Sequence, residues 1–143
     1  MYSPVIVAKA ILYYSRRYNP DGISLNKLHK LIYLVAEDSA TSENIWPFEH
    51  DVTFTPTASG PCLTAVADYF KDYAFYETLS VSVERSEIKH VDISSINRVV
   101  KRFSHTPPWL LVDLIMGPGT INWQRCHDNN TAAITFSDVG LHS

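Results

Sequence analysis

The amino-acid sequence predicts a single, mainly α-helical domain over residues 1–143, with about five helices around a central helix and a small β element. Apolar residues recur with a helical period in the segment 23–36, and helix start and stop signals bound several other segments. Alternating β-branched residues occur only in short runs. A chain of 143 residues with 45% hydrophobic content is long enough to form one core.

The segment 23–36 is predicted to be the central helix. Leu25, Leu28, Ile32 and Val35 recur at steps of three and four, and Leu31 widens this stripe. The turn-forming residues 19–22 precede it, and the hydroxyl of Ser24 is suited to cap its N-terminus. A helix that is apolar on more than one side is expected to pack on several neighbours.

The remaining elements follow from similar local signals. The predicted helices, besides the central one, span residues 4–18, 60–70 and 106–117, and a further helix that Asp92 or Ser94 can cap extends through Phe103. The predicted strands span residues 52–55 and 133–136, and a hairpin could join residues 79–83 to 87–91. Residues 37–47 are expected to form a loop, and the short turn 19–22 is expected to make an antiparallel helical hairpin.

Composition narrows the class of protein. A net charge of −3 and a pI near 6.0 argue against nucleic-acid binding through overall positive charge, although a local basic patch is still compatible with nucleic-acid binding. Two cysteines form no disulfide framework and fit a reducing compartment. The apolar run 5–14 is too short to span a bilayer, and its flanking charges are in the wrong order for a signal peptide. We therefore expect a cytoplasmic protein without a membrane partner.

No residue pattern predicts catalysis, a metal site or a cofactor. Cys62 follows Gly60-Pro61 at a predicted helix N-terminus, where the helix dipole can lower a thiol pKa, but the sequence shows no positioned base. A small hydrolase using Cys62 stays an alternative to a buried structural cysteine. Cys126-His127-Asp128 places three ligand types together without the spacing of a metal site. Gly117-Pro118-Gly119-Thr120 is better explained as a helix stop than as a phosphate loop.

Two surfaces are candidates for binding a partner. Lys27, Lys30 and Leu34 lie on the side of the central helix opposite its main stripe, with Tyr33 beside them, and this combination is typical of a small interface centre. The competing interpretation is that Leu34 packs under Gly60-Pro61 and the lysines lie over it.

The second candidate is a basic helix face formed by Arg98, Lys101 and Arg102. These three residues are spaced to share one side of their predicted helix. The face could bind an acidic partner or DNA, as in a transcriptional regulator with a basic recognition helix. A solvated face opposite Ile96 and Val100 explains the same spacing.

Four segments together resemble the SocA-like, or Panacea, antitoxin domain. The segment 23–33, ISLNKLHKLIY, is similar to the family signature T/S-N-L-K-L-Q-K-L-L-Y, although His29 replaces the usual Gln. Residues 7–12 stand where the family has its first helix. Gly60-Pro61, followed by Tyr69-Phe70, resembles its Y-G-P element. Residues 110–114 and Trp123 stand where a Leu-rich segment and a Trp occur.

The resemblance covers about residues 4–127 and implies a function that composition does not. It implies a divergent antitoxin, encoded on a prophage or mobile element, that binds its cognate protein toxin directly. In some members the antitoxin delivers the toxin to an AAA+ protease. The expected lack of a catalytic site, cofactor and metal agrees with this implication. A DNA-binding regulator that uses the basic face is the alternative function.

Overall fold

The computed structural model describes residues 2–118, 120–127 and 132–140. The mainly helical fold with a small β element is confirmed. The helices in the described residues are α1 (Pro4–Ser15), α2 (Leu25–Ser42), α3 (Thr64–Tyr69), α4 (Arg85–Ile88), α5 (Ser94–Phe103), α6 (Pro108–Ile115), α7 (Ile121–His127) and α8 (Phe136–Gly140). Two strands, β1 (Thr55–Thr57) and β2 (Gly60–Cys62), form an antiparallel ribbon. The helices missing from the prediction are the short α4, α7 and α8.

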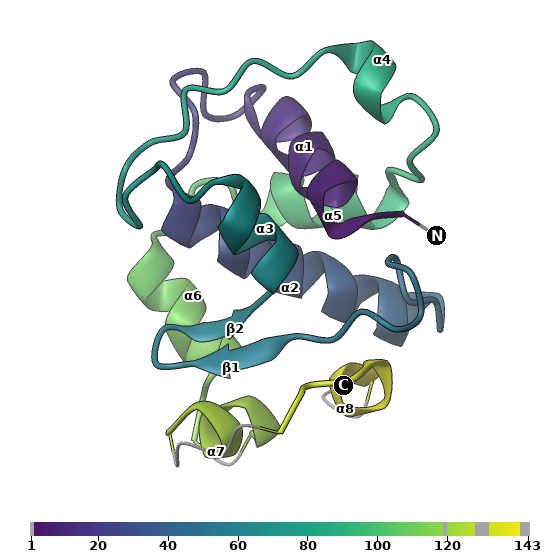
Figure 1. Ribbon diagram of the computed structural model, residues 1–143, viewed down its shortest axis with the longest axis vertical. Coiled ribbons are helices and arrows are strands. Elements are labelled where there is room, and N and C mark those ends of the chain that lie inside the picture. The colour runs from purple at the N-terminus through teal and green to yellow at the C-terminus, as the bar shows by residue number, and fades with distance from the viewer. Residues whose placement is uncertain (1, 119, 128–131, 141–143) are drawn as a thin grey trace.

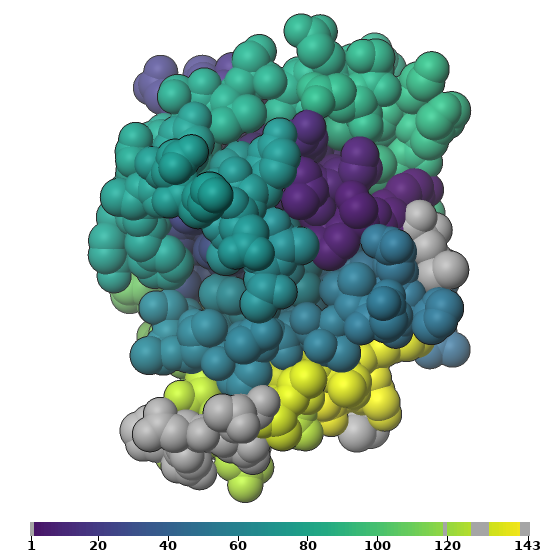
Figure 2. Space-filling model, in the orientation of Figure 1, coloured from purple at the N-terminus to yellow at the C-terminus, as the bar shows by residue number. Residues whose placement is uncertain are grey.

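Helix α2 occupies the centre of the fold, as the sequence predicts (Figure 1). The Ser24 hydroxyl accepts a hydrogen bond from the Lys27 amide at 3.1 Å, so the predicted cap is confirmed. Around α2 lie α1, α5, α6, α8 and β2. Every residue from Leu25 to Ala36 is buried because neighbours cover the helix on all sides. Figure 2 shows the segment that carries β1 and β2 crossing one face of the molecule as a band below α3 and α1.

The central helix is longer than predicted. It continues to Ser42, through residues that the sequence places in a loop. Ser39 and Ala40 are buried and extend the core-facing stripe by one turn. Small side chains therefore face the core here, whereas larger aliphatic side chains do so earlier in the helix. The aromatic loop predicted after it begins only after Glu43, and its Trp46 and Phe48 are buried in the core.

Helix α1 and helix α2 form the predicted helical hairpin, although α1 ends at Ser15 rather than at residue 18. The Ser3 side chain caps α1, and α2 runs back across it after the turn (Figure 1). Gly22 closes the turn with a φ of 95°, and a Cβ there would lie 2.8 Å from the Leu79 carbonyl oxygen. The turn therefore requires glycine at this position.

The helix predicted from Gly60 onward is wrong over its first residues. Gly60 has a φ of 121°, which is incompatible with a helix, and Gly60–Cys62 pairs with Thr55–Thr57 as β2. Helix α3 begins only at Thr64. The predicted strand at 52–55 is displaced toward β1, and Pro56 lies within that strand opposite Pro61. A two-stranded ribbon tolerates both prolines because its outer edges need no ladder hydrogen bonds.

Two further β predictions are wrong. Residues 79–83 and 87–91 form no hairpin. Instead the four-residue helix α4 begins after Glu84, which forms a capping box with Glu87. The predicted last strand is reduced to a single bridge in which Ile134 exchanges two backbone hydrogen bonds with Phe54, before α8 begins at Phe136.

Helices α5 and α6 agree with the prediction. Ile96 and Val100 are buried on the inner side of α5, and the Asp92 carboxylate accepts a hydrogen bond from the Ser94 amide at 3.0 Å at its start. Pro107 precedes α6, and Gly117 follows its end. None of the helices in the described residues is both long and apolar enough to cross a bilayer.

Candidate interaction surface

The partner-binding surface predicted on α2 is not exposed. Lys27, Lys30, Tyr33 and Leu34 are all buried, with exposed fractions of 8% or less. The prediction assumed that the side of α2 opposite its main stripe faces solvent. That side is instead covered by α5, by the β1–β2 turn and by residues near Phe75. An external partner therefore cannot reach these four side chains in this structure.

The two lysines bind backbone and side-chain oxygens within the fold. The Lys27 ammonium donates to the Ser104 carbonyl, just after the end of α5. The Lys30 ammonium donates to Asn26 Oδ1 at 2.5 Å and to the Ser59 carbonyl at 3.2 Å. Burial lowers the pKa of both lysines because desolvation disfavours the charged form. Both side chains thus join α2 to neighbouring elements.

Tyr33 and Leu34 are core residues as well. The Tyr33 hydroxyl accepts a hydrogen bond from Asn122 Nδ2 at 2.6 Å, and burial raises the pKa of Tyr33. Leu34 lines one groove together with Val99 and Phe103 of α5. The competing interpretation was therefore right that Leu34 packs internally, but its neighbour is α5 rather than Gly60-Pro61.

The basic face of α5 is weaker than the sequence predicts. Arg98 forms ion pairs with Asp38 at 2.7 Å and Glu43 at 2.6 Å, and these hydrogen bonds raise its pKa. Lys101 and Arg102 are exposed, and the Arg102 guanidinium lies 5.0 Å from the centre of the Phe103 ring. Arg98 therefore joins α5 to the C-terminal end of α2, which leaves two cations on the predicted patch.

Helix α6 carries an exposed apolar face that was not predicted from the sequence. Trp109, Leu110 and Leu114 are exposed by 69%, 39% and 56%, whereas Leu111 and Ile115 are buried on the inner side. Positions 109 and 110 precede positions 113 and 114 by three to five residues, about one helical turn, so all four share the outer side of the helix. Asp113 is also exposed there, and no hydrogen bond or ion pair joins its carboxylate to another described residue.

A signal for this face was present in the sequence. The segment PWLLVDLI has one polar residue, Asp113, and one helix face against the core cannot bury all of its apolar side chains. The abundant aromatic residues of the chain are a poorer guide, because Tyr33, Trp46, Phe48 and Phe54 lie in the core. Composition alone thus could not distinguish core aromatics from those at a surface.

Cys62 lies in β2, so the prediction that it begins a helix is wrong. It lines a small cavity together with His29, Lys30 and Met116. Desolvation raises the pKa of the Cys62 thiol, which opposes formation of the thiolate that a nucleophile needs. No group of three potential metal ligands occurs in the described part of the chain, and Asp128 of the Cys126-His127-Asp128 run lies outside it.

Three of the segments that carry the family resemblance meet at one small cavity. Lys30 of α2, Gly60-Pro61 of β2 and Val112 of α6 line it. Trp123 belongs to α7, which packs on β1 and β2. Comparison with family models, curated proteins and solved structures finds no match for this chain.

Proposed function

We propose that this chain is a SocA-like antitoxin that neutralises its cognate protein toxin by direct binding. The resemblance in sequence supports this proposal, and so does the contact between its segments. Lys30, which is part of the signature on α2, donates to the carbonyl oxygen of Ser59 immediately before Gly60-Pro61. Signature residues that join distant segments of the chain are consistent with a domain fold shared with the SocA-like family. Partner binding then falls to other surfaces of the domain.

The apolar face of α6 carries the proposal that the function is protein binding. Trp109 and Leu114 are more than half exposed, although burying such side chains is favourable by about 1.5–3 kcal/mol each. A tryptophan beside two leucines is typical of the few residues that provide most of the affinity of an interface. Such a face on a small domain indicates a protein partner.

The charge on this face indicates the chemistry of its partner. Asp113 lies among the three apolar side chains of the outer side of α6 and has no ion-pair partner in the described residues. A toxin segment that covers the face would leave this carboxylate desolvated unless it supplied a cation. We therefore infer that the toxin presents an apolar segment with a Lys or Arg opposite Asp113.

The DNA-binding alternative is less well supported. A recognition helix needs free basic or amide side chains along its exposed side. Arg98 already binds Asp38 and Glu43, and the acidic residues beside it oppose the approach of phosphate.

The proposal is tested with the product of the neighbouring gene in the operon, where toxin partners are usually encoded. Wild-type chain should co-purify with that product and restore growth of cells that express it. The half-life of the toxin in the same cells shows whether an AAA+ protease also removes it.

The informative variant is Trp109→Ser with Leu114→Asp. Both side chains are exposed, so the circular dichroism spectrum and Tm should stay close to wild type while capture and growth rescue are lost. Tyr76→Asp is the matched control, because it adds a charge at an aromatic residue that is 80% exposed elsewhere. Normal capture by the folded double variant would contradict binding through α6.

A further inference from the structure

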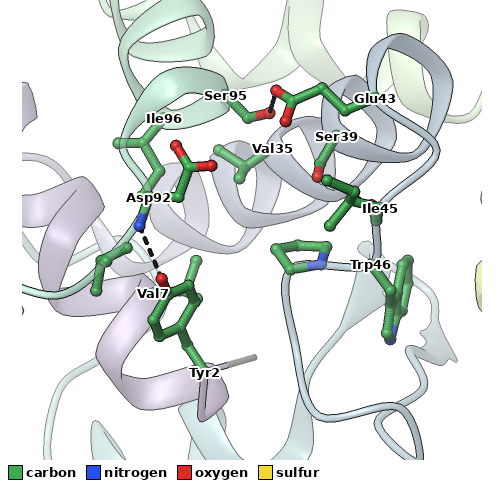
Figure 3. Close-up of a pocket in the computed structure, with 12 residues that line it drawn as sticks. Tyr2, Val7, Val35, Ser39, Glu43, Ile45, Trp46, Asp92, Ser95 and Ile96 are labelled. Atoms are coloured by element: carbon green, nitrogen blue, oxygen red, sulfur yellow. Dashed lines mark hydrogen bonds between the residues drawn. The ribbon is translucent and has the colours of Figure 1, made fainter.

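A second feature of the surface is a cavity of about 220 Å³ near the C-terminal end of α2. It lies between that end of α2, the start of α1, the loop 45–47 and the residues that lead into α5 (Figure 3). Helix α6, which carries the proposed toxin-binding face, lines a different cavity through its inner residues Val112 and Ile115, together with His29 and Lys30 near the other end of α2. The cavity is therefore separate from the proposed toxin-binding surface.

The inner wall of the cavity is apolar. Val7, Val35 and Ile96 are almost completely buried and contribute aliphatic surface, and Trp46 adds an aromatic ring. Trp46 is held in place because it stacks on Phe136, with ring centres 5.3 Å apart, and its indole nitrogen donates to the Val52 carbonyl at 3.1 Å. The wall is thus preformed and suited to the apolar body of a ligand.

The hydroxyl groups of the cavity are already bonded to the protein. Tyr2 donates to the His90 carbonyl at 2.7 Å and accepts from the Asp92 amide at 3.1 Å. Ser39 donates to the Ile45 carbonyl at 2.9 Å, and Ser95 donates to Glu43 at 3.3 Å. Polar recognition of a ligand therefore falls to the carboxylates.

Negative charge predominates at the mouth. Asp92 points its carboxylate into the space beside Ile96 and Val35 (Figure 3). One of its oxygens accepts from the Ser94 amide, and no cation pairs with it among the described residues. Glu43 also lines the cavity, and Arg98 is shared between Glu43 and Asp38. The cavity is thus lined by two carboxylates, and of these only Glu43 has an ion-pair partner among the described residues.

We propose that this cavity binds an organic cation, with an ammonium or guanidinium group at Asp92 and an apolar body against Val35, Ile96 and Trp46. The ligand cation supplies the direct ion-pair partner that Asp92 lacks among the described residues, and the apolar wall favours an organic body over a strongly hydrated metal ion. The pKa of Asp92 is lowered by its hydrogen bonds from Ser94, so the carboxylate is ionised at neutral pH.

The size of the cavity limits the ligand. Small-molecule sites usually have volumes of about 300–1,000 Å³, and 220 Å³ is smaller. A short aliphatic amine or a single arginine side chain has the appropriate size and the same chemistry. These two sources, a free amine and a residue of a peptide, can be distinguished by experiment.

The test measures methyl chemical shifts of Val7, Val35 and Ile96 in the full chain during titration at constant ionic strength. The free-amine probe is 3-methylbutylamine, and its neutral counterpart is 3-methylbutan-1-ol. The side-chain probe is Nα-acetylarginine amide, and its neutral counterpart is Nα-acetylcitrulline amide. We expect saturable shifts with at least one cationic probe and about tenfold weaker binding of its neutral counterpart. The cationic probe that binds more tightly identifies the source of the ligand.

A pair of matched Asp→Asn variants keeps the test independent of folding. Asp92→Asn removes the charge but keeps an oxygen that can cap Ser94, so it should fold and bind about tenfold more weakly. Asp72→Asn, at an exposed position elsewhere, is the matched control and should bind as wild type does. Val35→Phe should fill the cavity and abolish binding. Absence of shifts with both cations, equal binding of the neutral probes, or unchanged affinity in Asp92→Asn would each overturn the proposal.

Discussion

The side chains of Lys27, His29 and Lys30 show how polar residues can be buried on a central helix. A helical wheel places the two lysines opposite the apolar stripe, where solvent is expected. Their long aliphatic stems instead cross the buried surface, and their ammonium groups reach oxygens of Ser104 and Ser59. These acceptors belong to segments distant in sequence, so local periodicity could not predict that the lysines are buried.

His29 provides a prediction at the scale of one residue. Its ring stacks on Phe75, its Nδ1 has no hydrogen-bond partner among the described residues, and burial beside Lys30 lowers the pKa of His29 from 6.5 to about 4. Between these values the unfolded chain binds a proton that the folded chain does not. Lowering the pH from 7 to 4 should therefore cost about 3 kcal/mol of stability through His29.

Urea denaturation at several pH values measures this effect. His29→Gln, which restores the residue usual in the resembled family, should remove that part of the pH dependence. His50→Gln, at an exposed histidine, is the matched control and should keep the wild-type profile. Parallel profiles of wild type and His29→Gln between pH 7 and 4 would show that His29 does not contribute.

At the scale of elements, α2 provides the centre of the core. Leu28 and Ile32 are fully buried where α1, α5, α6 and β2 surround the helix. Leu28→Ala and Ile32→Ala should each lower the free energy of unfolding by about 2–5 kcal/mol, because each leaves a cavity that a close-packed interior cannot fill. Chemical denaturation measures the loss.

Leu114→Ala is the control for these core variants. It removes the same atoms as Leu28→Ala from a side chain that is 56% exposed, and it should change stability by less than about 1 kcal/mol. A similar loss for Leu28→Ala and Leu114→Ala would mean that α2 is not the centre of the fold.

The elements differ in how well the sequence predicts them. Helices α1, α2, α5 and α6 have caps and apolar stripes within one segment, and they were predicted with errors mainly at their ends. The region 55–64 depends on tertiary structure, because Gly60 adopts a positive φ and its strand pairs with β1. The hairpin predicted at 79–91 does not form: its apolar residues join or pack against the common core, and Glu84 and Glu87 form the capping box at the start of α4.

At the scale of the whole molecule, the two proposed binding regions lie at different ends of α2. Helix α6, which carries the proposed face, packs near the start of α2, and the cation cavity lies near its end. Neither was predicted as a site. The cavity is assembled from four separate segments, whereas the α6 face was detectable as an excess of apolar residues around Asp113. The residues that were predicted as a site, on α2, instead hold the domain together.

The central claim is that the toxin binds the outer side of α6 and leaves α2 covered. Hydrogen–deuterium exchange of the chain, alone and with the neighbouring gene product, tests this claim most directly. We expect new protection over residues 107–118 in the complex, and no change over residues 25–36, whose amides are already protected. Protection absent from α6, or increased exchange in α2 as its buried lysines become exposed to the partner, would contradict the claim.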